Sequence, residues 1–260
     1  MSAATQLPLE LWQFRLSMYP EKARWALDYK GIPHVRRSCL PGPHIAVLVP
    51  RFRQKALPIL THGKSVIKGS AGISDYLEQA FPEPALYPAD PALRARALEL
   101  QTWFDDAGAH VRRAYFRDFL PSGAYAADLF SAGYPPLLRT LYRLAFPGTR
   151  MVMKLDMMIT DRGADEGLRR TQEALDIVIK NRGPAGYLVG DRFSVADLAA
   201  AVILQPVALP EEYPVAFSQP RPPGLEKWLA RWAAHPGIEW VREMYRRHRG
   251  QSAATEDRNG

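Results

Sequence analysis

The sequence predicts an α/β domain followed by a larger all-helical domain, and three observations carry this prediction. Over residues 9–80, apolar and amphipathic stretches follow the order strand, helix, strand, an unassigned stretch, two strands and a helix. Residues 81–91 (FPEPALYPADP) hold four prolines in 11 positions, which is typical of a linker. Beyond them every patterned stretch favours helix, and none convincingly favours a strand.

The first domain opens with a strand and a helix. Residues 9–14 (LELWQF) are short and rich in apolar side chains, which predicts a strand. A helix is expected over residues 20–30, because Pro20 suits the first helical position and Gly31 suits the position just past the end. PHVRRS, residues 33–38, predicts a second strand.

A hairpin and a helix complete the first domain. Residues 39–55 are rich in Pro and Gly at first and then basic, and no element is assigned to them. ALPIL, 56–60, and SVIK, 65–68, predict two strands joined by the turn THGK. Ser70 can cap a helix over residues 71–80.

The second domain is expected to be helical throughout. The predicted helices cover residues 92–118, 134–146, 151–160, 165–181, 194–205 and 225–248. Two stretches interrupt this pattern. Residues 119–150 are punctuated by Pro and Gly, and residues 206–224 hold six prolines in 19 positions. Irregular stretches of that length are usually functional or disordered.

The charge of the chain is a weaker guide to function. Lys and Arg number 34 against 27 Asp and Glu, a surplus of seven that would suit a nucleic acid, a lipid surface or a small acid. The cations are spread along the chain, and no basic motif with interleaved aromatics favours a nucleic acid. Only residues 242–249 are densely basic; we expect a solvated helix end there and a disordered tail over residues 251–260.

Composition also argues against several classes of protein. Cys39 is the single cysteine, which excludes an internal disulfide scaffold. The longest runs without charged residues have 13 positions, short of the roughly 18–20 that a membrane-spanning helix needs. The first residues show no secretory signal, so a cytoplasmic protein is expected. The six histidines lack the paired spacing of metal ligands, so no metal is expected.

Three short segments could carry chemistry. Ser17 lies in the turn before the first helix, where free N–H groups favour anions and its hydroxyl could donate to a thiolate. A cis bond at Leu57-Pro58 would expose the backbone of Leu57, although X-Pro bonds are far more often trans. The hydroxyl of Ser70 and the N–H groups after it could hold a carboxylate. The alternatives are an ordinary turn residue at Ser17 and an ordinary helix cap at Ser70.

Together these segments resemble the glutathione transferase family, and the resemblance covers nearly the whole chain. Residues 17–34 (SMYPEKARWALDYKGIPH) are similar to the serine-type active-site turn and first helix of tau- and zeta-like members. Residues 56–82 (ALPILTHGKSVIKGSAGISDYLEQAFP) are similar to the cis-Pro strand, the hairpin and the glutathione-carboxylate helix. Residues 86–91 (LYPADP) are similar to the interdomain linker, and residues 187–204 (YLVGDRFSVADLAAAVIL) to the capping-box segment of the second domain. Ser194 and Asp197 have the S-x-x-D spacing of that box.

The resemblance implies a fold and partners. It implies a thioredoxin-like glutathione-binding domain over residues 1–82, a linker over 83–91 and a helical bundle over 92–250. It further implies a homodimer that uses glutathione as co-substrate and conjugates it to a small apolar electrophile, as in detoxification. The alternatives are a non-catalytic binding or assembly protein on the same fold, or a dedicated glutathione-dependent isomerase or lyase.

The resemblance also implies roles for single residues. Ser17 would hydrogen-bond the glutathione sulfur. The backbone of Leu57, with Pro58 in the cis form, would pair with the cysteinyl part of glutathione. Ser70 would hold the γ-glutamyl carboxylate, and Lys55 falls near a position that contacts the glycyl end.

One position departs from the family pattern, and the second substrate is placed less firmly. Gly69 stands where the family usually has an acidic or amide residue, which puts the contact to the γ-glutamyl amine in doubt. The second substrate would lie between the domains, with Tyr19, His110, Arg113 and Tyr115 as candidates by position only. Tyr19 is also a rival to Ser17 as the hydroxyl donor.

The irregular stretches and a group of methionines bear on the same pocket. Residues 119–150 and 206–224 are predicted to flank or cover it. Met151, Met153, Met157 and Met158 could line an adaptable apolar pocket, with ordinary helix core as the stronger alternative.

Overall fold

A computed structural model describes residues 8–259 and shows a mixed sheet with helices on both faces, followed by a helical domain. The elements of the first domain are β1 (Leu9–Gln13), α1 (Met18–Tyr29), β2 (His34–Ser38), α2 (His44–Phe52), β3 (Ile59–His62), β4 (Ser65–Lys68) and α3 (Ser70–Ala80). The sheet order is β4-β3-β1-β2-β5, with β1 and β2 parallel and β3 antiparallel to β1. The predicted fold class is confirmed, and the unassigned stretch contains α2.

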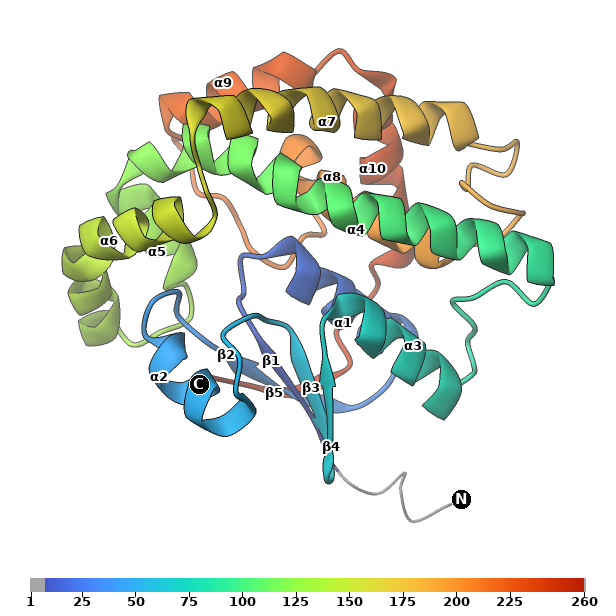
Figure 1. The fold of residues 1–260 in the computed structure, drawn as a ribbon, viewed down its shortest axis with the longest axis horizontal. Helices are drawn as coiled ribbons and strands as arrows, with labels where there is room; N and C mark the ends of the chain where they lie inside the picture. The colour runs from blue at the N-terminus through green and yellow to red at the C-terminus, as the bar shows by residue number, and fades with distance from the viewer. Residues whose placement is uncertain (1–7, 260) are drawn as a thin grey trace.

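Helix α1 is the element that links the two domains. It follows an extended residue, Ser17 (φ −158°), and ends before Gly31, whose φ of +63° is the left-handed conformation that glycine adopts without strain. Its side chains Ala23, Trp25 and Leu27 are fully buried. The helix packs against α3 on one side and α8 on the other (Figure 1).

The second domain surrounds a buried central helix. Its elements are α4 (Pro91–Phe119), η2 (Leu120–Ser122), α5 (Ala124–Phe130), α6 (Pro136–Asp156), α7 (Asp161–Asn181), α8 (Val195–Ala208), α9 (Pro223–Trp232) and α10 (Pro236–His248). Every residue of α8 is buried, and α4 and α7 run alongside each other over it (Figure 1). The predicted capping box is confirmed, because Ser194 and Asp197 exchange side-chain and backbone hydrogen bonds at the start of α8.

Two helix boundaries differ from the prediction. The stretches 134–146 and 151–160 form one continuous helix, α6, which passes through Pro147. The stretch 225–248 divides into α9 and α10, because Pro236 lacks the N–H that a continuing helix would need.

A disordered tail was predicted over residues 251–260; the prediction was wrong for residues 254–259, and residue 260 lies outside the described residues. The prediction that no strand follows the linker was also wrong. Ala254–Asn259 forms β5, which pairs in parallel with β2 at the edge of the first domain's sheet. Asp257 accepts a hydrogen bond from the Ser38 hydroxyl at 2.7 Å, and the N–H of Ala253 donates to Asp28 at 2.8 Å. The strand sequence ATEDRN has no apolar alternation, so the sequence alone does not predict a strand here. The strand is held by these long-range contacts.

None of the helices in the described part of the chain has the length and apolarity needed to cross a bilayer.

Candidate functional site

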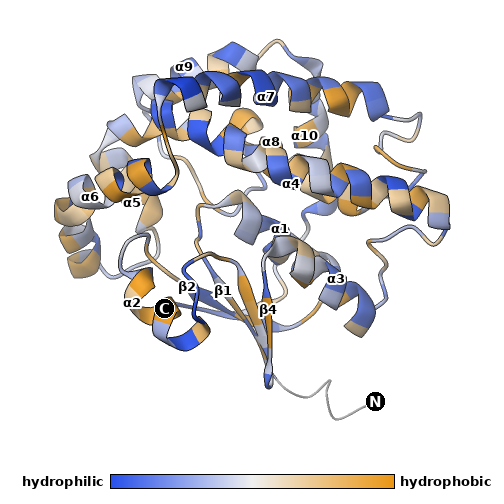
Figure 2. Cartoon of the chain, in the orientation of Figure 1, coloured by the Kyte–Doolittle hydropathy of each residue, from blue (hydrophilic) through white to orange (hydrophobic). Residues whose placement is uncertain are grey.

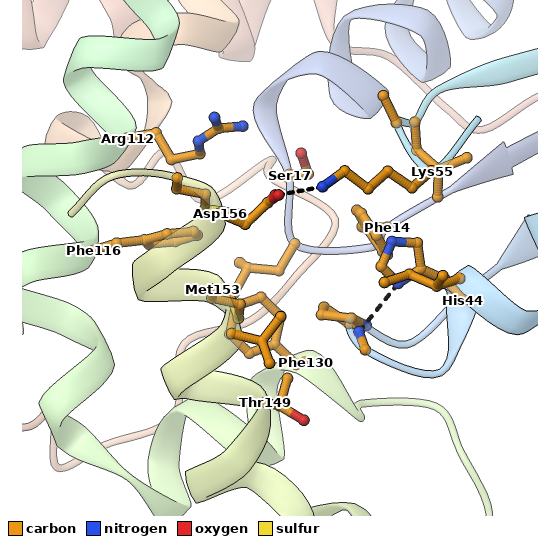
Figure 3. A pocket seen from close by; sticks show the side chains of 18 of the residues that line it. Phe14, Ser17, His44, Lys55, Arg112, Phe116, Phe130, Thr149, Met153 and Asp156 are labelled. Atoms are coloured by element: carbon orange, nitrogen blue, oxygen red, sulfur yellow. Dashed lines mark hydrogen bonds and ion pairs between the residues drawn. The ribbon is translucent and has the colours of Figure 1, made fainter. Parts of the chain in front are cut away.

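A cavity of about 270 Å³ lies between the carboxyl ends of β1 and β2 and the helices α4, α5 and α6. The first domain contributes the turn before α1, the loop before α2 and the segment before β3 (Figure 3). The helical domain contributes mostly apolar side chains, among them Phe116, Phe130 and Met153. The side of the cavity formed by the first domain carries Ser17 and Lys55 among apolar residues and is called the polar wall below; the side formed by these three residues of the second domain is called the apolar wall.

Ser17 lies on the polar wall, at the position just before α1. Its carbonyl accepts the first helical hydrogen bond, from the N–H of Glu21 at 3.0 Å. Its hydroxyl makes no hydrogen bond to any of the residues 8–259, not even the local cap bond common at this position. A hydrogen-bond donor is therefore available at the amino end of a helix, where an anion is stabilised.

The turn that carries Ser17 is held from behind by Arg24. The Arg24 guanidinium donates to the carbonyls of Phe14 at 3.1 Å and Arg15 at 3.0 Å, and to the Gln13 side chain at 2.6 Å. Arg24 is itself buried and paired with Glu21 at 2.6 Å. These bonds fix the backbone around Ser17 without using its hydroxyl.

The segment before β3 presents an unpaired backbone. The Leu57-Pro58 bond is cis, as the resemblance implied, and Leu57 lines the cavity. Among the described residues, neither the N–H nor the C=O of Leu57 has a backbone hydrogen-bond partner. An extended peptide lying along this segment could therefore pair with both groups.

The start of α3 lies next to that segment. The N–H of Gly69 donates to the Pro58 carbonyl at 3.0 Å, which ties the two together. Ser70 is buried, and its hydroxyl has no hydrogen-bond partner within residues 8–259; it does not itself line the 270 Å³ cavity. Gly69 has φ +76°, so a side chain at this position would strain the backbone. Position 69 therefore offers no side chain to a ligand.

Lys55 and Asp156 form an ion pair across the cavity, joining the first domain to α6 (Figure 3). Both side chains are about half exposed, so the pair is accessible to a competing ligand. His44, from the first domain, also lines the cavity, and burial lowers the pKa of its imidazole. The N–H of Gly42 donates to His44 Nδ1 at 3.1 Å. Sequence reasoning missed His44 because it lies in the stretch that was left unassigned.

Tyr19 lines the cavity, but its hydroxyl is already used. It donates to the Asp105 carbonyl of α4 at 2.8 Å, and burial raises the pKa of Tyr19 to about 12. The side chain also lies against Gly108, where an added Cβ would come within 2.7 Å of the Tyr19 hydroxyl. Tyr19 thus fixes α1 against α4, and Ser17 is the free hydroxyl on this wall.

The residues that α4 sends to the cavity differ from those predicted. Arg112 and Phe116, one turn apart, line the cavity, and Tyr115 lies at a smaller neighbouring one. His110 and Arg113 line neither cavity, and Arg113 donates to the Met157 carbonyl at 3.1 Å. Neighbouring residues on a helix point about 100° apart, so choosing Arg113 over Arg112 selects a different face.

Arg112 is the notable cation of the site. Its guanidinium has no ion pair or hydrogen bond to the residues the structure describes, and its Nε is buried without a partner. In Figure 3 it reaches from α4 toward the side of the cavity that holds Ser17. Burial lowers the pKa of Arg112, as expected for a cation without a partner.

Both irregular stretches reach the cavities beside Ser17. Phe130 and Thr149 of residues 119–150 line the main cavity, and Tyr213 of residues 206–224 lines the smaller one beside Ser17. Of the four methionines, Met153 and Met157 line the cavity, whereas Met151 and Met158 are exposed. Within residues 8–259 no cluster of His, Cys, Asp and Glu has the arrangement of a metal site.

Comparison with known proteins gives the same two-part division. Residues 11–85 match the family described as "Glutathione S-transferase, N-terminal domain", and residues 148–236 match "Glutathione S-transferase, C-terminal domain". A probable glutathione S-transferase from Solanum tuberosum is 29% identical over 109 residues, which are 42% of this chain and 50% of that protein. Glutathione S-transferase U13 from Arabidopsis thaliana is 24% identical over 232 residues, 86% of this chain and 85% of its own.

Apart from the Arabidopsis protein, the chain spans about half the length of the curated relatives that it matches. Among solved structures, a glutathione S-transferase from Methylobacterium radiotolerans in complex with glutathione sulfonate has a TM-score of 0.54 at 20% identity. That match covers 89% of this chain and 93% of the other. At this identity the match supports the fold alone.

Proposed function

We propose that this chain, which belongs to the glutathione S-transferase family, binds glutathione along the polar wall of its cavity and conjugates the glutathione thiolate to a small apolar electrophile. The observation that carries the proposal is the hydroxyl of Ser17, which faces the cavity at the amino end of α1 with no protein partner among the described residues. A free donor at a helix start suits a thiolate ligand.

The energies are sufficient for such a role. Lowering a thiol pKa from about 8.5 to about 6.5 takes roughly 2.7 kcal/mol. A hydrogen bond from the Ser17 hydroxyl to a charged sulfur contributes about 1.5–3 kcal/mol. The start of α1 adds about 0.3–1 kcal/mol. Together they account for the shift without a metal ion.

The rest of glutathione has partners along the same wall. In the proposed complex, the N–H and C=O of Leu57 pair with the cysteinyl backbone, and the start of α3 with Ser70 holds the γ-glutamyl carboxylate. Lys55 takes the glycyl carboxylate, which requires that it leave Asp156. Because that pair is half exposed, its loss costs only about 0–1 kcal/mol.

The transfer itself needs little more than placement. The thiol proton leaves to solvent, and the thiolate sulfur forms a bond to the electrophilic carbon while the leaving group departs with its electron pair. The electrophile lies against Phe116, Phe130 and Met153, on the apolar wall. We propose that the active form is a homodimer, the usual state in this family.

The experiment is a glutathione titration followed by thiolate absorbance at a series of pH values. Ser17→Ala is compared with wild type and with Ser65→Ala, which removes an exposed hydroxyl from β4. We expect wild type and Ser65→Ala to bind glutathione with a thiol pKa well below about 8.5, and Ser17→Ala to raise that pKa by about 1–2 units. No binding by wild type, or an unchanged thiol pKa in Ser17→Ala, would contradict the proposal.

A second candidate function is a non-catalytic binding protein on the same fold, and Gly69 is the observation that favours it. Position 69 has no side chain for the γ-glutamyl amine, and its positive φ disfavours one. This candidate predicts that wild type fails to bind glutathione at millimolar concentration. The titration above therefore decides between the two candidates.

A further inference from the structure

Helix α6 presents an apolar face to solvent. Its inward contacts are confined to a narrow seam that contains Tyr142, Phe146 and Met153. The helix exposes seven large apolar side chains, each between 45% and 75% accessible, and most of them lie opposite this seam: Leu137, Leu138, Leu141, Leu144, Met151, Val152 and Leu155. Figure 2 shows this helix at the outer edge of the molecule. An apolar patch of this extent on a water-soluble domain marks an interaction surface.

The periodicity shows that the apolar side chains form one continuous face. Leu137, Leu141, Leu144, Met151 and Leu155 recur at spacings of three, four or seven residues, which places them on one side of the helix. A helix of 21 residues is about 31 Å long, and the face from Leu137 to Leu155 extends over roughly five of its turns. The face is long and convex, and it is suited to a broad partner rather than to a small ligand.

The charges beside the face are nearly all positive. Arg139, Arg143, Arg150 and Lys154 lie on α6, and its single acidic residue is Asp156. Asp156 is paired with Lys55 at the cavity, and Arg143 is paired with Asp128. Arg150 and Lys154 have no ion pair with any residue that the structure describes. Two free cations therefore flank the apolar face.

A third cavity lies beside these cations, which form part of its lining. It has a volume of about 250 Å³ and is lined by Arg117, Arg150 and Lys154, with Asp161 as its one acidic residue. Arg117 already has acidic partners in Asp118 and Asp165. Arg150 and Lys154 thus remain available for an anion that approaches from the side of α6.

We propose that α6 binds an anionic lipid bilayer, with its apolar face in the headgroup and acyl boundary and a lipid phosphate beside Arg150 and Lys154. Apolar residues on one face and Lys or Arg beside them are the features of helices that lie in a membrane interface. A second copy of this chain suits the face less well, because packing α6 against itself would bring the two sets of cations together. The inference does not depend on the proposed function.

The same helix forms a wall of the 270 Å³ cavity. Val152 is both exposed on the apolar face and part of the cavity lining, and Met153 and Met157 follow it inward. A molecule dissolved in the lipid layer that contacts α6 would therefore reach the cavity by passing this helix. If the proposed function is also correct, this arrangement favours electrophiles that partition into lipid.

The test is co-sedimentation of the full chain with vesicles of phosphatidylcholine, with and without phosphatidylglycerol. We expect binding to the anionic vesicles that weakens with salt. Arg150→Gln/Lys154→Gln should lower the partition coefficient on anionic vesicles about 30-fold, since each cation near the surface is worth about fivefold. Leu144→Glu should reduce binding to background, because it places a charge in the centre of the apolar face.

Matched controls separate this surface from general charge and hydrophobicity. Arg94→Gln/Arg96→Gln removes the same charge from α4, and Leu93→Glu replaces an exposed leucine there. Both should bind vesicles within about twofold of wild type. Circular dichroism confirms that each variant is folded.

Three results would overturn the proposal. The first is a folded wild type that ignores anionic vesicles or binds neutral vesicles equally well. The second is an equal loss of binding in the α6 and α4 variants. The third is a wild-type dimer that Leu144→Glu converts to monomers in analytical ultracentrifugation, which would assign the face to a second copy.

Discussion

A group of buried charged side chains along α1 and the lining of the 270 Å³ cavity are built in opposite ways. Along α1, Glu21 bridges Arg24 and Arg249, each at 2.6 Å, and Asp28 bridges Arg36 and Arg249, each at 2.8 Å. In this group, the buried network, every charged side chain has an opposite partner.

The cavity, by contrast, holds groups that the protein leaves unpaired. Arg112 has no acidic partner among the described residues, and the Ser17 hydroxyl and the Leu57 backbone have no hydrogen-bond partner there. The Nε of Arg112 is buried without a partner, and a ligand in the cavity could supply one. The buried network holds the fold together, and the cavity leaves polar groups available to the ligand that we propose.

The sharpest test of this contrast is one substitution made at both sites. Arg249→Met removes two charge-assisted hydrogen bonds, so we expect the free energy of unfolding to fall by about 3 kcal/mol. Arg112→Met removes a cation that has no partner to lose, so we expect a change within about 0.5 kcal/mol or a small gain. Urea unfolding measures both. Equal losses at the two sites would show that the contrast does not hold.

A change of pH tests the border of the buried network. His248 stacks on Phe193 and bonds the Tyr187 hydroxyl at 3.0 Å, and burial lowers the pKa of His248 to about 4. Its uncharged form is therefore favoured by folding: the contribution to stability is complete above about pH 6.5 and is lost as the pH falls toward 4. Because His248 is only half buried, solvent screens part of this effect, and the loss at pH 5 is about 1 kcal/mol.

Thermal unfolding at pH 7.5 and pH 5 measures this effect, with His248→Gln as the matched variant. The variant lacks the titrating group, so its stability should fall less between the two pH values. A wild type and a variant that lose equal stability would show that other groups account for the acid sensitivity.

The smallest expected effect compares two serines that occupy the same helical position. Ser194 accepts a hydrogen bond from the N–H of Ala196 at 3.3 Å, whereas Ser17 makes no such bond. We therefore expect Ser194→Ala to lower the free energy of unfolding by about 1 kcal/mol and Ser17→Ala to lower it by less than about 0.5 kcal/mol. Chemical denaturation measures both. A larger loss at Ser17 would mean that its hydroxyl serves the helix and not a ligand.

Sequence reasoning succeeded where the signals were local. The hairpin turn, the capping box at Ser194 and the end of α1 before Gly31 each depend on a few neighbouring residues, and all three were predicted. It failed where the partner is distant in the chain. β5 is held by contacts to Asp28 and Ser38, more than 200 residues earlier, and its own sequence shows no strand pattern.

The candidate site divides in the same way. Ser17 and Leu57 were found because a turn and a proline mark their places in the chain. Arg112 was missed in favour of Arg113, because only the packing of α4 decides which of two adjacent arginines faces the cavity. Asp156 was missed because its ion pair with Lys55 joins α6 to the first domain, and neither segment shows a sequence pattern that predicts such a pair.

The place of β5 has a consequence for the order in which the chain becomes complete during translation. Residues 9–80 supply four strands of the sheet, yet β2 still has an open edge when they leave the ribosome. Until residues 248–259 follow, Glu21 and Asp28 have one guanidinium partner each, and the indole N–H of Trp25 lacks the His248 carbonyl that it bonds at 2.8 Å. The α/β domain is synthesised before the helical domain, yet it is finished only after the whole helical domain has followed.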